Sequence, residues 1–215
     1  NILVWRSANI SGMRPQIIAL LGSPLTEGNT AKLLKKSVSG AEAAGCDVRV
    51  IHVPELELTA CREFYFCKDH ETCMIEDDVS GLYPAFREMG SMIIATPVMT
   101  MGIPGHLKSF MDRFQVFYCA KYVRKKRLVS KEKRSVRRTL LLSISGMNIP
   151  ENFDGVTLSV RSFCDILDCR YDDELLIRDM DNKVDLDRFP DLLDDAYQKG
   201  FRLGGLLTGK YCNTE

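Results

Sequence analysis

Residues 17–30 read IIALLGSPLTEGNT, an apolar run followed by a polar loop that contains two glycines. A helical pattern begins at Ala31, so the stretch predicts a buried strand, a loop and the start of a helix. Such a junction binds phosphate in α/β proteins, because the helix start has a partial positive charge and free backbone N–H groups. Side chains of the loop can donate further hydrogen bonds to the same anion: those of Ser23, Thr26, Asn29 and Thr30.

The loop lacks both established glycine fingerprints for nucleotides. It contains no G-x-G-x-x-G sequence, and it does not end in the Gly-Lys-Ser/Thr of a P-loop. We therefore expect the phosphate of a mononucleotide here, rather than a dinucleotide or ATP. A βα turn without any ligand is the alternative interpretation.

Strand and helix signals alternate along the rest of the chain. Strands are expected at residues 16–21, 48–53, 91–96, 139–145 and 171–177. This alternation predicts an α/β protein with a parallel sheet and helices on both faces. Five such strands suit the flavodoxin-like doubly wound order 2-1-3-4-5, in which the ligand lies beyond the carboxyl ends of the strands. The loops that meet there are residues 22–30, 97–104 and 145–152.

Length and composition fit one globular unit. The chain has 215 residues, of which 45% are hydrophobic and 27% charged. We expect a single flavodoxin-like domain over residues 13–215, preceded by a leader at residues 1–12 to which we assign no function. No apolar run approaches the roughly 20 residues that a membrane-spanning helix needs. Eight cysteines in a chain of this size, without a secretion signal, favour the reducing cytoplasm.

Charge is balanced overall but unevenly placed. The net charge of zero argues against nucleic acid as a partner. Residues 121–138 contain ten lysines and arginines, whereas residues 172–195 contain ten acidic residues. Such segments are either solvated faces or complementary contacts between subunits. We expect a homo-oligomer, most simply a symmetric dimer.

A second loop, residues 96–108, reads TPVMTMGIPGHLK. Pro97 and Gly102 mark a chain reversal that exposes backbone N–H groups beside the first loop. Such donors suit the polar edge of a flavin ring, and Met99 and Met101 offer soft apolar contacts to a flat aromatic surface. A plain βα turn with core methionines is the alternative.

These segments together resemble a known family. The sequences Gly22–Thr30, Pro97–Val98 and Pro104–Arg113 are similar to those of the NADPH-dependent FMN reductase family. Cysteines at positions 61, 67 and 73 make the resemblance strongest to its iron–sulfur flavoprotein branch. The resemblance covers residues 16–115 well and the remainder only by the order of its elements.

The resemblance implies bound FMN, with NAD(P)H as electron donor. It assigns the phosphate to one group of residues: Ser23, Thr26, Gly28, Asn29 and Thr30. It assigns the ring to a second group: Pro97, Val98, Met99, Thr100 and Met101, with Ser145 and Gly146 on a third side. Two positions depart from the family, which usually has an aromatic residue in place of Met99 and a small one near Met101.

The cysteine loop departs further from the family. Iron–sulfur flavoproteins have four cysteines here, but Phe64 stands in place of the second, leaving Cys61, Cys67 and Cys73. Three thiolates leave one iron of a cubane cluster open, and His70 or Cys119 are candidates for a fourth ligand. A loop of three thiols without metal is an equal alternative, and a Cys3His zinc site with His70 is a weaker one. We expect the three thiols to form one spatial cluster.

We conclude from the sequence that this is an FMN-dependent NAD(P)H oxidoreductase that passes electrons to flavin, quinone or another small-molecule or protein acceptor. The flavin would carry the chemistry, so no catalytic side chain is assigned. One alternative is an electron carrier with an iron–sulfur cluster in residues 61–73. Another is a flavodoxin-like binding module without turnover.

Overall fold

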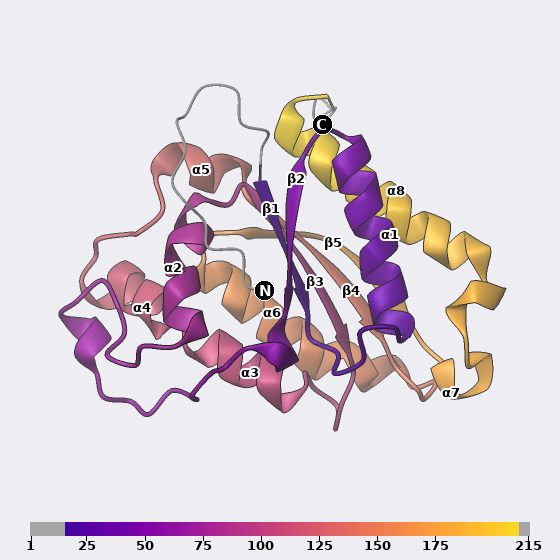
Figure 1. The fold of residues 1–215 in the computed structure, drawn as a ribbon, viewed down its shortest axis with the longest axis horizontal. Helices are drawn as coiled ribbons and strands as arrows, with labels where there is room; N and C mark the ends of the chain where they lie inside the picture. Colours follow the sequence, from indigo (N-terminus) through magenta and orange to yellow (C-terminus); the bar gives the residue numbers. More distant parts are fainter. Residues whose placement is uncertain (1–15, 211–215) are drawn as a thin grey trace.

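The computed structural model describes residues 16–210, and the leader expected at residues 1–12 lies outside them. Its centre is a sheet of five parallel strands in the order β2-β1-β3-β4-β5 (Figure 1). The strands are β1 (Gln16–Leu21), β2 (Asp47–His52), β3 (Ser91–Pro97), β4 (Arg138–Ile144) and β5 (Arg170–Ile177). The predicted flavodoxin-like α/β order is confirmed.

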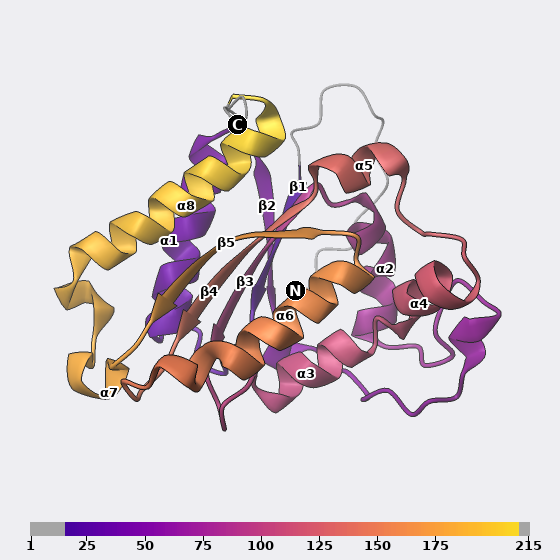
Figure 2. The same cartoon turned by 180° about the vertical axis from the view of Figure 1, so that it is seen from behind.

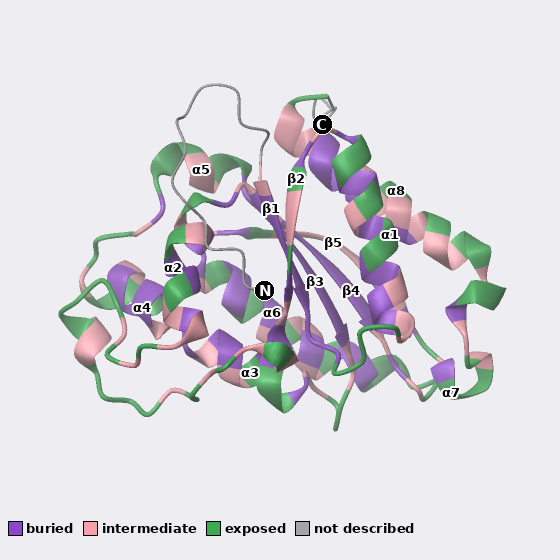
Figure 3. Cartoon of the chain, in the orientation of Figure 1, coloured by how far each residue is buried: buried purple, intermediate pink, exposed green. Residues whose placement is uncertain are grey.

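Burial follows the position of each strand in the sheet. The central strands β1, β3 and β4 are buried over almost their whole length, whereas the edge strands β2 and β5 also contain half-buried and exposed residues (Figure 3). A strand covered by helices on both faces needs an unbroken apolar run. The run Ile17–Leu21 therefore belongs in the middle of the sheet, which brings the loop that follows it to the centre of one edge.

Helices cover both faces of the sheet, as Figure 1 and Figure 2 show from opposite sides. On one face lie α1 (Asn29–Ala43) and α8 (Pro190–Thr208), and on the other lie α2 (Asp78–Glu88), α3 (Gly105–Asp112) and α6 (Asp154–Ile166). The shorter elements are α4 (Gln115–Tyr118), a π-helical turn (Cys119–Val123), α5 (Lys131–Val136) and α7 (Met180–Lys183). None of the helices between residues 16 and 210 is long and apolar enough to cross a membrane.

The two helices on the first face pack closely because of two glycines. A Cβ at Gly40 would come within 3.0 Å of the carbonyl oxygen of Tyr197, and a Cβ at Gly200 would approach that of Ser37 as closely. Backbone atoms cannot yield to such a contact, so larger residues would push the helices apart. The helix that follows the phosphate loop is thus fixed along its length by α8.

The two charged segments pair with other parts of the same chain. Arg138 of the basic segment and Asp172 of the acidic segment form an ion pair at 2.8 Å across β4 and β5. Other pairs connect these segments to neighbouring elements: Lys121 with Asp165, Arg127 with Asp168, Lys133 with Glu88, and Lys32 with Asp185. The uneven charge distribution is therefore accounted for inside the fold and does not by itself require a second subunit.

The long connection between β2 and α2 contains only two short 3-10 turns, yet a buried arginine holds it in place. Arg113, at the end of α3, has a fully buried side chain. Its guanidinium donates to the carbonyl oxygens of Thr59 at 2.7 Å and Ile75 at 3.1 Å, and it pairs with the carboxylate of Asp77. Asp77 also caps α2 by accepting hydrogen bonds from the backbone of Val79 and Ser80. Arg113 thus holds both ends of the cysteine loop, which comprises residues 59–77.

This ion pair makes the attachment of the loop sensitive to acid. Burial raises the pKa of the Asp77 carboxyl, but hydrogen bonds from Arg113 and from backbone N–H groups outweigh burial and hold the pKa below 3.8. A carboxyl with a lower pKa in the folded state contributes stability above the unfolded value, and this contribution is lost as the pH falls through the folded pKa. We expect Asp77→Asn to lower the free energy of unfolding at neutral pH by about 3 kcal/mol, because Arg113 then stays buried without its anion.

The measurement is urea unfolding at neutral and acid pH. The difference between Asp77→Asn and the unmodified protein should shrink as the pH falls below 3.8, the ordinary pKa of an aspartate. Glu76→Gln changes an exposed acid one residue away and should have little effect. Equal stability of the Asp77 and Glu76 variants at neutral pH would contradict this account of the loop.

Candidate functional site

The three loops predicted to meet at one edge of the sheet do meet there. They follow β1, β3 and β4, whose carboxyl ends lie together because the strands are parallel (Figure 1). Backbone hydrogen bonds join each loop to a neighbouring strand: Gly22 N–H to the carbonyl of Ala95, Val98 N–H to that of Ile144, and Ser145 N–H to that of Ile177. The first residues of each loop are therefore held to the sheet.

The first loop leads into the start of α1, which has no side-chain cap among the described residues. Gly28 occupies the N-cap position, and the first helical hydrogen bond runs from Lys32 N–H to its carbonyl at 3.0 Å. The preceding N–H groups of the first turn have no acceptor within the helix. A phosphate fits such donors, because it accepts several hydrogen bonds and its charge is stabilised by the helix dipole.

Side chains next to these donors fix the shape of the loop. The Ser23 hydroxyl accepts a hydrogen bond from Leu25 N–H at 3.2 Å, and Ser23 and Thr30 are both buried, whereas Thr26 is exposed. The His52 ring, at the end of β2, lies with its Nε2 2.7 Å from the carbonyl oxygen of Ser23. The histidine therefore has a structural role, which is to hold the backbone of the loop at Ser23.

Asn29 has partners that the sequence does not reveal. Its side-chain nitrogen donates to the carbonyl of Val184 at 2.8 Å, and its side-chain oxygen accepts from Leu186 N–H at 3.0 Å. The amide therefore ties the segment after α7 to the start of α1. Its predicted contact with phosphate stays a prediction, and its observed contribution is to hold the rim of the site.

Lys32 forms a second tie to the same segment. Its ammonium lies 2.5 Å from a carboxylate oxygen of Asp185 and 2.5 Å from one of Asp187. Hydrogen bonds to Asp185 and then to Asp187 raise the pKa of Lys32, and the bond from Lys32 lowers the pKa of Asp185. Asp185 and Asp187 are thus paired with a cation of α1.

The second loop is a tight two-residue turn at the end of β3. Met99 and Gly102 exchange both backbone hydrogen bonds, at 2.9 and 3.0 Å, and form an isolated antiparallel bridge. The residues between them, Thr100 and Met101, have φ of 50° and 59°. Positive φ at both central positions is the pattern of type I′ turns, which normally use glycine or asparagine there. The exposed side chains of Met99 and Met101 lie at this turn.

The third loop follows β4 and is held by a buried amide. Asn152 is fully buried, and its side-chain nitrogen donates to the Ser145 hydroxyl at 2.6 Å and to the Met147 carbonyl at 3.3 Å. Gly146 lies so close to Asp181 that a Cβ would stand 2.5 Å from a carboxylate oxygen. The three loops therefore gather all twelve residues predicted to hold FMN along one edge of the sheet, although individual contacts stay predictions. Sequence reasoning missed Lys32 and Asn152, of which only Asn152 lies in a predicted site loop.

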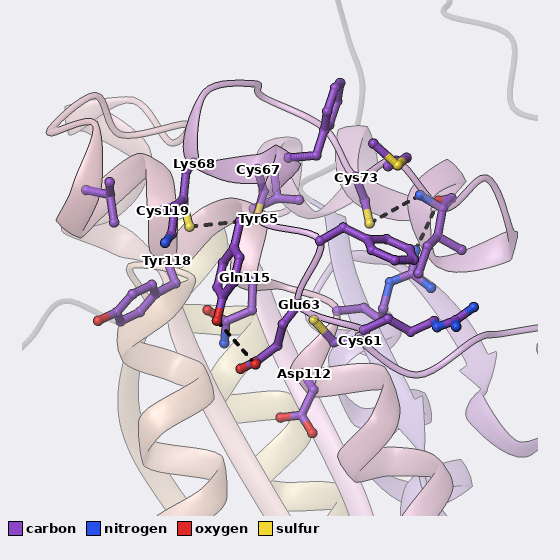
Figure 4. Close-up of a pocket in the computed structure, with 18 residues that line it drawn as sticks. Cys61, Glu63, Tyr65, Cys67, Lys68, Cys73, Asp112, Gln115, Tyr118 and Cys119 are labelled. Carbon is purple, nitrogen blue, oxygen red and sulfur yellow. Dashed lines mark hydrogen bonds between the residues drawn. The ribbon is translucent and has the colours of Figure 1, made fainter.

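The cysteines line a separate cavity of about 460 Å³ beside α3 and α4 (Figure 4). Cys61, Cys67 and Cys73 reach it from the loop, and Cys119 reaches it from the π-helical turn. The sulfur atoms of Cys67 and Cys119 lie 3.7 Å apart. Burial, and then the hydrogen bond with Cys119, raise the pKa of the Cys67 thiol to about 12. In this arrangement the thiol nearest to Cys67 comes from another part of the chain.

The three loop thiols line one cavity, but they are not gathered tightly enough to form a metal site. Among residues 16–210 no group of three or more His, Cys, Asp or Glu side chains is placed to hold a metal ion. His70 is engaged elsewhere, since its ring stacks on Phe66 at 3.7 Å and its Nδ1 lies 3.1 Å from the Phe66 carbonyl oxygen. Phe64 is half exposed at the place of the missing cysteine. The thiols share one cavity, but the zinc site with His70 has no support in this geometry.

Comparison with known proteins agrees with this layout. The sequence model of the NADPH-dependent FMN reductase family matches residues 15–147. This range includes β1 to β4 and the loops that follow β1 and β3. An iron–sulfur flavoprotein of Methanocaldococcus jannaschii is 32% identical over 98 residues, which are 46% of this chain and 51% of that protein. One of Methanosarcina thermophila is 28% identical over 98 residues, with the same shares. The chain spans about half the length of the curated relatives it matches.

Solved structures share the fold at low sequence identity. A flavone reductase has a TM-score of 0.64 and 14% identity, covering 90% of this chain and 63% of its own. An NAD(P)H:quinone oxidoreductase from Methanothermobacter marburgensis has a TM-score of 0.62 and 17% identity, covering 89% of this chain and 100% of its own. Together with the family match over more than half of the sequence, these findings show that the chain belongs to the NADPH-dependent FMN reductase family and is similar to its iron–sulfur flavoproteins.

Proposed function

We propose that this protein is an FMN-dependent oxidoreductase that takes electrons from NAD(P)H and passes them to a flavin, a quinone or another acceptor. The observation that carries the proposal is the uncapped start of α1 at the carboxyl edge of the sheet, where two further loops lie beside it. A single phosphate group satisfies such a helix start, and no dinucleotide fingerprint follows the loop in the sequence. The arrangement therefore supports FMN rather than FAD.

Different residues would bind the phosphate and the ring of FMN. Backbone N–H groups of the first turn of α1, with the hydroxyls of Ser23, Thr26 and Thr30, would hold the phosphate. Residues 97–101 and the Ser145–Gly146 pair would flank the ring. When bound, FMN supplies hydride acceptance from a nicotinamide and electron release to an acceptor. The protein would bind and orient the partners, and the exposed Met99 and Met101 would offer them an apolar surface.

We also propose a domain organisation, a cellular compartment and an oligomeric state for this protein. Residues 13–215 would form one domain, supported by the single sheet with an apolar core on each face. The protein would act in the cytoplasm, where its thiols stay reduced. It would form a homo-oligomer, supported by exposed apolar side chains in the loops at the flavin edge, such as Met99 and Met147.

Binding of FMN to variants of the phosphate loop tests the proposed site. We expect Thr30→Val to weaken FMN binding about tenfold, because a lost hydrogen bond to a charged group costs 1.5–3 kcal/mol. Asn29→Ala should also weaken binding, because it frees the segment at residues 184–186 from the start of α1. Ser39→Ala, on the exposed side of the same helix, is the matched control and should bind like the unmodified protein.

The dissociation constant can be measured by fluorescence titration, and turnover by mixing the FMN-loaded protein with NADH or NADPH without oxygen. Loss of the flavin absorbance is the expected result with at least one donor. Failure of the unmodified protein to bind FMN, or full affinity in Thr30→Val, would show that the assigned phosphate site is wrong. Bound FMN that neither donor reduces would refute the oxidoreductase proposal and favour an electron carrier.

A second candidate function is that of an electron carrier with an iron–sulfur cluster. The observation that favours it is the cavity of about 460 Å³ lined by four thiols, in which Cys119 faces Cys67. Thiolates are the ligands that iron–sulfur clusters use. In this proposal Cys119 supplies the thiolate that the chain lacks at Phe64, and the side chains of Cys67 and Cys119 turn toward the cluster when it binds.

Reconstitution with iron and sulfide without oxygen tests this candidate. We expect Cys119→Ser to lose most of the bound iron and sulfide, and Phe64→Cys in the same variant to restore them. Cys164→Ser is the matched control, because Cys164 is buried in α6 outside the cavity. Iron and sulfide content and electron paramagnetic resonance report the cluster directly. No bound iron in the unmodified protein, or equal iron in Cys119→Ser, would rule out a cluster with this ligand.

A further inference from the structure

The segment that begins α6 touches two of the three loops at the proposed flavin edge. Gly155, in the first turn of the helix, lies against the turn that follows β3. Asn152, just before the helix, lies against the loop that follows β4. Neither residue is among those that the sequence assigns to FMN. Each of them, however, contacts a loop that contains such residues.

The contact at Gly155 leaves no room for a side chain. A Cβ at this position would stand closer than 3.0 Å to the carbonyl oxygen of Met101, and at 3.3 Å from its carbonyl carbon and 3.4 Å from the Cα of Gly102. All three contacts are with backbone atoms, which cannot rotate away as the end of a side chain can. Any larger residue at 155 must therefore displace the turn or the helix.

The turn at this contact is one that needs support. Thr100 and Met101 both have positive φ, a conformation that is unfavourable for residues other than glycine. Such backbone persists only where the surrounding structure determines it. Because the carbonyl of Met101 fits against Gly155, the helix limits where the turn can lie.

Asn152 acts on the opposite loop in a comparable way. Its backbone N–H donates to the Ile149 carbonyl at 3.3 Å, and its side-chain nitrogen bonds Ser145 and Met147. Its side chain is completely buried. The loop at residues 145–149 is therefore folded around this amide.

We infer that Gly155 and Asn152 are positioning residues for the flavin ring: they set the separation between the turn at residues 99–102 and the loop at residues 145–147. The inference rests on the proposed function, since these two segments are the ones that would flank the ring. Neither residue is exposed as a ligand of the ring. Each acts through the backbone of the segment it holds.

The test measures FMN affinity and the midpoint potential of bound FMN in Gly155→Ala. We expect the dissociation constant to rise at least about tenfold, because overpacking against backbone displaces the turn, and the potential to shift. The matched control is Gly105→Ala at the start of α3, three residues after the same turn, where a Cβ meets nothing within 4 Å. Gly105→Ala should keep both the affinity and the potential of the unmodified protein.

A second substitution separates positioning from a general loss of stability. Met101→Gly removes the cost of positive φ and lets the carbonyl at 101 move, so adding it to Gly155→Ala should recover most of the affinity. Asn152→Ala should weaken FMN binding and shift the potential in the same manner. Loss of thermal stability without recovery by Met101→Gly would mean that Gly155 serves packing alone, and would overturn the inference.

The outcomes also separate this inference from the proposed function. If the unmodified protein binds no FMN, the proposed function fails. If it binds FMN and Gly155→Ala binds it equally well with the same potential, the proposed function stands and the inference about α6 is wrong.

Discussion

The constraint on which the site depends is the unsatisfied first turn of α1. A helix start exposes backbone N–H groups that need acceptors, and no described side chain caps this one. The helix cannot shift to find acceptors for these N–H groups, because Gly40 and Gly200 bring its backbone into contact with that of α8. The fold thus holds a fixed set of donors at the carboxyl edge of the sheet, an arrangement that suits an anion.

The remaining parts of the site follow from what surrounds that helix start. Asn29 and Lys32 join it to the segment after α7, so this segment forms one rim. The turn after β3 and the loop after β4 form the other sides, and both meet the beginning of α6. The cysteine cavity is built separately: Arg113 holds the loop at its ends, and Cys119 completes the thiol lining from another element.

Sequence patterns were sufficient for the order of the strands and for bringing the three predicted loops to one edge of the sheet, because both depend on local signals. The run Ile17–Leu21 and the loop after it indicate a central strand and a phosphate site without any knowledge of tertiary contacts. Side-chain partners were harder to predict, since the bonds of Asn29 to residues 184 and 186 cross more than 150 positions of sequence. The sequence offered Cys119 as one of two candidate partners for the loop cysteines, but it could not choose between them, because the proximity of Cys119 to Cys67 depends on how an irregular loop packs on the rest of the chain.

The most direct test of the account is a crystal structure of the protein with FMN. We predict a phosphate within hydrogen-bond distance of the N–H groups in the first turn of α1, and a ring between the turn at residues 99–102 and the loop at residues 145–147. A phosphate bound anywhere else, or a ring that lies outside these two segments, would contradict the central claim that this helix start is the cofactor site.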